Sequence, residues 1–248
     1  RESASLILTD DNFASIVAGV DEGRVAYNNV RKVIFLLISC GAAEIILFFM
    51  ALFSGLPLPL FAAQLLWLNL VTNGIQDVAL AFEPAEGNEM HRPPRPPKEK
   101  IFNPLMTSRV LLSAAVIGGI SFFYYHHLLS IGWTASDARN SLLLLLVLFE
   151  NMQVFNSRSE FKSAFIHNPL RNPILFFGVM GAQLIHIGAM YTPVIKDVLG
   201  IHPVSLAHWV ELFLLALTAI VVMELEKLIR KILKMRTGRM RDFGNGPG

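Results

Sequence analysis

The stretch "WLNLVTNGIQDVALAFEP", residues 67–84, places polar side chains inside an apolar segment. They are Asn69, Thr72, Asn73, Gln76 and Asp77. Spacings of three and four residues put all five on one face of an α-helix. In a membrane-spanning segment such a stripe should face protein or an ion rather than lipid, and Gly74 lets the helix loosen beside it. Simple hydrogen bonding between helices is the open alternative.

The composition of the whole chain indicates a membrane protein. Hydrophobic residues make up 53% of the 248 residues and charged residues 16%, and the mean hydropathy is +0.51. These values exclude an average soluble domain. Because a span needs about 20 mostly apolar residues, we predict an all-α, polytopic membrane helix bundle with six transmembrane helices. These spans cover residues 33–53, 61–82, 110–131, 140–156, 172–193 and 208–226.

The basic residues predict the orientation of these spans. Lys and Arg gather in the link after the second span, in the link after the fourth and in the tail. The opposite links hold only Arg139 and Lys196. Since basic residues favour the cytoplasmic side, we expect an integral, multi-pass membrane protein with both termini cytoplasmic. Membrane lipid is the expected partner of the basic tail, and no nucleic acid partner is indicated.

Four parts follow from these patterns. Residues 1–12 resemble the last piece of a cytoplasmic domain whose remainder is absent, and residues 13–32 a stalk helix. Residues 33–226 form the six-helix transmembrane domain, and residues 227–248 a basic cytoplasmic tail. No proline interrupts the chain from Asn12 to Phe53, so one helix is predicted to run from the cytoplasm into the membrane. A plain solvated helix leading into the first span is the open alternative to a stalk.

Two further groups of polar residues lie at membrane depth. Glu44 is near the middle of the first span, and Glu150, Asn151 and Gln153 end the fourth. An ionisable group at the bilayer centre costs at least about 2.5 kcal/mol, so Glu44 should not face lipid. Snorkelling to the interface is the alternative for Glu150.

Oxygen ligands without a Cys or His cluster suit a hard cation such as Ca²⁺, Mg²⁺, Na⁺ or K⁺, or a proton. The polar residues of the first, second and fourth spans therefore predict a cation site. Glu224 and Glu226, at the end of the sixth span, are expected to be solvated. No catalytic residue is assigned, because the chain has no phosphate loop and no catalytic carboxylate pair of its own.

The sequence also resembles a known family. The segment "TDDNFASIVAGVDEGRVAYNNVRKVIFLLIS" is similar to the exit from the phosphorylation domain and the stalk helix of P-type cation ATPases of the calcium-pump type. The segment "QLLWLNLVTNGIQDVALAFEPAEGNEMHRPPRPPKEKIF" is similar to their sixth transmembrane helix and the loop after it. The resemblance covers essentially the whole chain and implies that residues 1–12 end the phosphorylation domain. It also implies that the six spans are the fifth to tenth helices of a ten-helix pump.

The resemblance implies ion-binding roles for individual residues. Glu44, Asn69, Thr72 and Glu150 match ligands of the calcium pump. Gly41 and Asn73 stand where that pump has a ligand asparagine and a ligand aspartate, and Asp77, one turn beyond, is expected to restore the lost charge. The predicted metal site comprises Glu44, Asn69, Thr72, Asn73, Asp77 and Glu150, supported by Gln76, Asn151 and Gln153. Ca²⁺ is the first expectation among the hard cations.

The function implied is that of the ion-translocating membrane domain of an ATP-driven cation pump. ATP and Mg²⁺ would bind only to the missing N-terminal pump domains, in the same or a complementary chain, so this chain alone should be inactive. An ATP-independent cation transporter or channel module and an accessory membrane bundle are the alternatives. By the same resemblance, the loop of residues 84–100 should contact the first-span helix near Tyr27 to Lys32.

Overall fold

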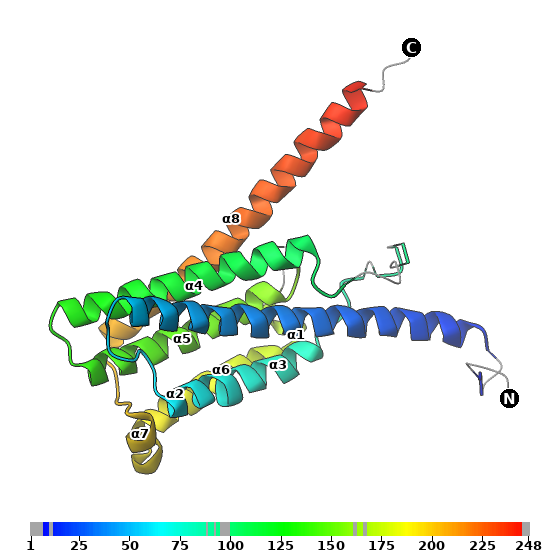
Figure 1. The fold of residues 1–248 in the computed structure, drawn as a ribbon. Coiled ribbons are helices and arrows are strands. Elements are labelled where there is room, and N and C mark those ends of the chain that lie inside the picture. Colours follow the sequence, from blue (N-terminus) through cyan, green and yellow to red (C-terminus); the bar gives the residue numbers. More distant parts are fainter. Residues whose placement is uncertain are drawn as a thin grey trace.

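A computed structural model describes residues 7–9, 12–87, 89–91, 93–94, 100–160, 163–165 and 168–244, with side chains of the last helix described to Leu233. Within these residues the regular elements are all helices, and no strand is present (Figure 1). The fold class is therefore all-α, as predicted. Most of the expected domain end at residues 1–12 lies outside the described residues.

The first helix, α1 (Ala14–Phe53), runs without a break for 40 residues. At 1.5 Å per residue its length is about 60 Å. Gly55, with a positive φ of 66°, turns the chain just after it. The prediction of one continuous helix is confirmed, and in Figure 1 the N-terminal part of α1 projects beyond the bundle.

The second predicted span consists of three consecutive helical pieces. They are α2 (Ala62–Leu66), the π-helix η1 (Trp67–Thr72) and α3 (Asn73–Ala81). A π-turn bonds residues five apart and widens the helix locally. Gly74 follows this turn, and a Cβ atom there would lie 3.8 Å from the carbonyl oxygen of Asn69. The sequence predicts that the helix loosens beside Gly74. The structure has this irregularity as the π-turn, which ends at Thr72, two residues before Gly74.

The remaining elements are α4 (Pro104–Ser130), α5 (Ala135–Ser157), the short 3₁₀ turn η2 (Pro169–Arg171), α6 (Pro173–Tyr191), α7 (Pro193–Leu199) and α8 (Leu206–Gly244). The side chains of Asn103, Thr134 and Asn172 cap α4, α5 and α6 by accepting backbone N–H groups. Helices thus occupy all six predicted segments. Helix α7 was not predicted from the sequence, and α8 continues past residue 226 with no break before the tail.

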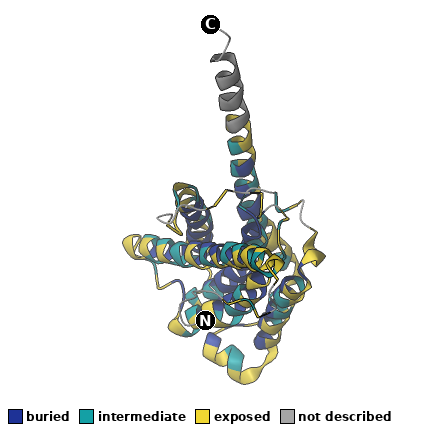
Figure 2. Cartoon of the chain, turned by 90° about the vertical axis from the view of Figure 1, so that its right-hand side faces the viewer, coloured by how far each residue is buried: buried dark blue, intermediate teal, exposed yellow. Residues whose placement is uncertain are grey.

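The centre of the bundle is α5. Every residue from Asn140 to Asn151 is buried, as expected of a helix whose middle is apolar all round. Neighbouring helices α1, α4 and α8 pack against it, and α3 contacts it at the polar residues. Figure 2 shows the buried residues gathered in the middle of the bundle and the exposed ones on its outer faces.

Four of the described helices are long and apolar enough to cross a membrane. They are α1, α4, α6 and the part of α8 up to Leu233. The α5 helix has polar residues near both ends, and the second predicted span is divided by the π-turn. A membrane helix bundle is therefore supported, whereas six crossings and a stalk outside the membrane stay predictions.

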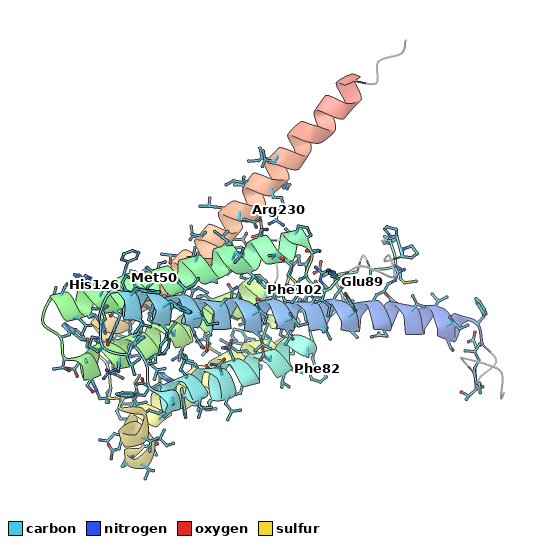
Figure 3. All side chains as sticks on the ribbon, viewed as in Figure 1. Met50, Phe82, Glu89, Phe102, His126 and Arg230 are labelled. Carbon is cyan, nitrogen blue, oxygen red and sulfur yellow. The ribbon has the colours of Figure 1, made fainter. Side chains whose placement is uncertain are left out.

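The loop after α3 lies against the N-terminal half of α1. Lys32 forms an ion pair with Glu86, with 3.7 Å between Nζ and Oε1. About two turns further out, Arg24 Nη1 donates to the carbonyl oxygen of Glu89 at 2.7 Å. Figure 3 shows Glu89 beside α1, at the same end of the bundle as Phe82 and Phe102 and opposite Met50 and His126. The predicted contact between this loop and the first helix is confirmed.

Candidate cation site

The carboxylate of Glu150 lies where α5 meets the second predicted span. Glu150 is 4% exposed. The hydroxyl of Thr72 donates to Oε2 of Glu150, and Asn73 Nδ2 donates to Oε1 at 3.0 Å. Since the side chain is buried against these partners, the alternative that Glu150 snorkels to the interface is wrong.

Glu44 brings a second carboxylate from α1. Both of its oxygens accept from Asn69 Nδ2 at 3.2 Å, and this nitrogen also donates to the carbonyl oxygen of Leu65 at 3.0 Å. Glu44 is half-buried and Asn69 is exposed. The site therefore has a closed half around Glu150 and an open half around Glu44.

The third carboxylate of the predicted set is Asp77 on α3. Glu150 interacts electrostatically with both Glu44 and Asp77. Within the described residues, three oxygen atoms along α3 are buried and accept no hydrogen bond: Asn73 Oδ1, Gln76 Oε1 and Asp77 Oδ1. Buried acceptors normally have a donor, so these oxygens are free to coordinate a cation.

The π-turn divides the polar stripe between two partners. Asn69 bonds to α1, whereas Thr72 and Asn73 bond to α5. Within the turn, Thr72 Oγ1 also lies 2.7 Å from the carbonyl oxygen of Leu68, so its one hydroxyl proton is shared between this oxygen and Glu150. A regular α-helix would have kept all these side chains on one face. The wider turn instead lets one short segment bond to carboxylates on two different helices.

The residues expected to support the ligands have different surroundings. Gln76 Nε2 donates to Asn151 Oδ1 at 2.7 Å, and Asn151 Nδ2 donates to Gln183 Oε1 on α6 at 2.7 Å. Gln153 instead donates to Ser39 Oγ at 2.9 Å and Ser113 Oγ at 3.1 Å. Gln76 and Asn151 thus form a network beside the candidate ligands, whereas Gln153 joins α5 to α1 and α4.

Two polar residues of α6 form hydrogen bonds to other helices outside the predicted ligand set. Gln183 extends the network to α6, and Trp67 Nε1 donates to Nδ1 of the fully buried His186 at 3.0 Å. Polar residues in the apolar segment 172–193 were the available signal for both.

A correction concerns Glu224, which accepts from the backbone N–H of Ala164 at 2.8 Å and from Lys227 Nζ at 3.0 Å. The expectation that Glu224 is simply solvated is wrong, because the chain after α5 folds over it.

The donor set of the site suits a hard cation. In the part of the chain that the structure describes, no three His, Cys, Asp or Glu side chains converge as a metal-binding group by themselves. Any ion here would therefore need amide and hydroxyl oxygens in addition to carboxylates. Ca²⁺ accepts such mixed sets of about six to eight oxygens, whereas structural zinc sites use Cys and His.

Known proteins similar to this chain are cation-transporting ATPases. The family model "Cation transporting ATPase, C-terminus" matches residues 57–229. The chain is 33% identical over 210 residues to a calcium-transporting ATPase of Bacillus subtilis. The aligned residues make up 84% of this chain and 24% of that protein. It is 30% identical over 234 residues to the mouse calcium-transporting ATPase type 2C member 2, covering 94% of the chain and 25% of that protein. It is 29% identical over 232 residues to a probable cation-transporting ATPase F of Mycobacterium tuberculosis, covering 94% of the chain and 26% of that protein. The chain thus spans about a quarter of the length of these curated relatives.

Proposed function

Because the chain belongs to the family of cation-transporting P-type ATPases, as its C-terminal membrane part, we propose that its helices bind the transported cation between α1, α3 and α5. The observation that carries this proposal is the buried Glu150 beside the oxygens of Asn73, Gln76 and Asp77 that accept no hydrogen bond. Hydrogen bonding between helices alone leaves these oxygens unexplained. A cation would satisfy them together with the carboxylate charges.

The residues of the site would act by exchanging hydrogen bonds for ion contacts. Thr72 and Asn73 hold the two oxygens of Glu150 by donating to them. When a cation takes these carboxylate oxygens, the amide of Asn73 turns its own oxygen toward the ion. The open half at Glu44 and Asn69 would be covered by pump helices that precede this chain. Binding and release would then follow movements of these helices.

We further propose that the six predicted segments all cross the membrane and that residues 13–32 of α1 are a cytoplasmic stalk. A rigid helix of about 60 Å can carry movement from a phosphorylated cytoplasmic domain to Glu44 in the membrane. The contacts of Lys32 and Arg24 with the loop after α3 pass such a movement on to the second site helix. ATP and Mg²⁺ would bind to domains outside this chain.

Ca²⁺ is the cation that we propose first. Two of the relatives described above are named calcium-transporting ATPases, and the candidate ligands are oxygens that include three carboxylates. The test is ATP hydrolysis by the purified full-length pump in vesicles, with Mg²⁺ present and Ca²⁺, Na⁺ or K⁺ added separately. Stimulation by Ca²⁺ alone is expected. Stimulation only by Na⁺ or K⁺ would contradict the choice of ion, and no stimulation by any of them would contradict the proposed pump.

The proposed topology makes a separate prediction. Single cysteines are introduced at Arg95, Arg239 or Pro57 in a full-length pump from which all native cysteines, including Cys40, have been removed. A membrane-impermeant thiol reagent should label positions 95 and 239 only from the cytoplasmic side, and position 57 only from outside, because basic links stay cytoplasmic. Labelling of position 95 from outside in sealed cells would show that the six-span topology is wrong.

A further inference from the structure

A buried ion pair joins the ends of the two helices that meet at Glu150. Glu83 follows α3 and Arg158 follows α5. Arg158 Nε donates to Glu83 Oε1 at 2.9 Å, and the two side chains are 2% and 3% exposed. Both partners of this ion pair are therefore almost fully buried. It lies outside the proposed cation site and carries none of its ligands.

The carboxylate of Glu83 also holds α6, and its backbone holds α1. Asn172, the N-cap residue of α6, donates through Nδ2 to Glu83 Oε2 at 2.9 Å and to the carbonyl oxygen of Ala79 at 3.0 Å. Asn29 on α1 donates to the carbonyl oxygen of Glu83 at 2.7 Å. On its other side, Arg158 Nη1 donates to the carbonyl oxygen of Asn168 at 3.2 Å. One buried group therefore ties together the same ends of α1, α3, α5 and α6.

Stability alone does not explain such a pair. Removing a guanidinium and a carboxylate from water is expensive, so well-packed apolar residues in their place are often as stable or more so. What the pair adds is a defined geometry, because a planar guanidinium bonds to a carboxylate in few orientations. A slide of α5 along α3 by even one residue, about 1.5 Å, would misalign it.

The pair lies close to the site along both helices. Asp77 precedes Glu83, and Glu150 precedes Arg158, by about two helical turns each. The bonds from Thr72 and Asn73 to Glu150 cross between the same two helices. An axial shift between these helices would therefore change the spacing of the oxygens around Glu150.

We propose that Glu83 and Arg158 are positioning residues for cation binding: their buried pair sets the register of α3 against α5 and so the spacing of the cation's oxygen ligands. This inference rests on the proposed function and adds to it residues that touch no ion. Groups that orient metal ligands without touching the metal commonly affect affinity about 10- to 100-fold.

The first test is Arg158→Lys in the full-length pump. Lysine keeps the positive charge but cannot reach Glu83 and the carbonyl oxygen of Asn168 together, because it lacks the forked guanidinium. We expect the half-saturating cation concentration for ATP hydrolysis to rise about tenfold, with maximal hydrolysis at saturating cation nearly unchanged. The matched control is Arg139→Lys, at the other end of α5, where Arg139 donates to the carbonyl oxygen of Leu58. It should leave the half-saturating concentration unchanged.

The second test separates positioning from stability. In the double variant Glu83→Met/Arg158→Met, no buried charge is left unpaired, so thermal stability in detergent should stay near that of the unmodified pump. If the pair sets the register, cation affinity should remain weakened in this stable protein. Unmodified cation affinity in the double variant, or a fall in maximal hydrolysis without a change in affinity after Arg158→Lys, would overturn the inference.

These outcomes differ from failure of the proposed function. A full pump whose hydrolysis responds to no cation would overturn the function, and this inference with it. A pump that responds to a cation with equal affinity in all variants would overturn the inference alone.

Discussion

Glu150→Gln in the full-length pump is expected to abolish cation-stimulated ATP hydrolysis at cation concentrations that saturate the unmodified protein. Glutamine keeps the shape of the side chain but removes a negative charge from a group that is 4% exposed and is bonded to Thr72 and Asn73. The cation affinity of oxygen sites depends steeply on the number of charged ligands. We expect the half-saturating cation concentration to rise about 100-fold or more, as measured by titrating hydrolysis with the cation.

Asp77→Asn and Glu44→Gln should act in the same direction, and more weakly, because both side chains are only half-buried. The matched controls are Asp197→Asn and Glu211→Gln, which make the same chemical changes at exposed positions on α7 and α8. Both controls should keep normal cation stimulation. If all three site variants also kept it, with unchanged affinity, the polar stripe would serve only to hold the helices together.

Gly118→Ala is expected to destabilise the bundle where α4 crosses α1. A Cβ atom at Gly118 would lie 2.6 Å from the carbonyl oxygen of Ala43 and 2.9 Å from Cβ of Ile46. Because the nearest atom belongs to the backbone of α1, the helices must separate. Overpacking of this kind commonly costs about 1–3 kcal/mol. Ala43 precedes Glu44, so weaker cation binding should accompany a lower melting temperature of the pump in detergent.

The next residue provides the control for this substitution. A Cβ atom at Gly119 would meet no heavy atom within 4 Å. Gly119→Ala therefore adds the same methyl group to the same helix without a clash, and alanine favours helix formation over glycine by about 1 kcal/mol. Equal destabilisation by both variants would show that the close approach of α4 to α1 is not what limits stability.

The positions of the helices could be predicted from the sequence because hydropathy and proline placement act locally. All six predicted apolar segments are helical, and α1 is continuous because no proline or turn glycine interrupts it before Gly55. The candidate ligands could also be proposed from the sequence, because a charged or amide side chain inside an apolar run is conspicuous wherever the helix later packs. The short helix α7 was missed, since seven residues carry too little periodic signal.

The partners of the polar side chains depended on packing and rotation of the helices. Sequence spacing placed Asn69 and Asn73 on one face, but the π-turn η1 directs them to Glu44 on α1 and to Glu150 on α5. Gln153 lies only two residues after Asn151 in the sequence, yet it donates to Ser39 and Ser113 rather than to the network of Asn151. Spacing along one helix gives the face on which a side chain lies, but it does not say which neighbouring helix packs against that face.

The sequence by itself thus determined an apolar helical chain, the approximate bounds of its helical segments and the oxygen-bearing side chains of the candidate cation site. The tertiary structure alone decided which carboxylate each amide bonds, that Glu224 is covered by the chain after α5, and that Glu83 pairs with Arg158. These contacts join residues 60 and 75 positions apart. Their energies depend on burial and on the distance between atoms of different helices, and neither quantity exists until the helices have packed.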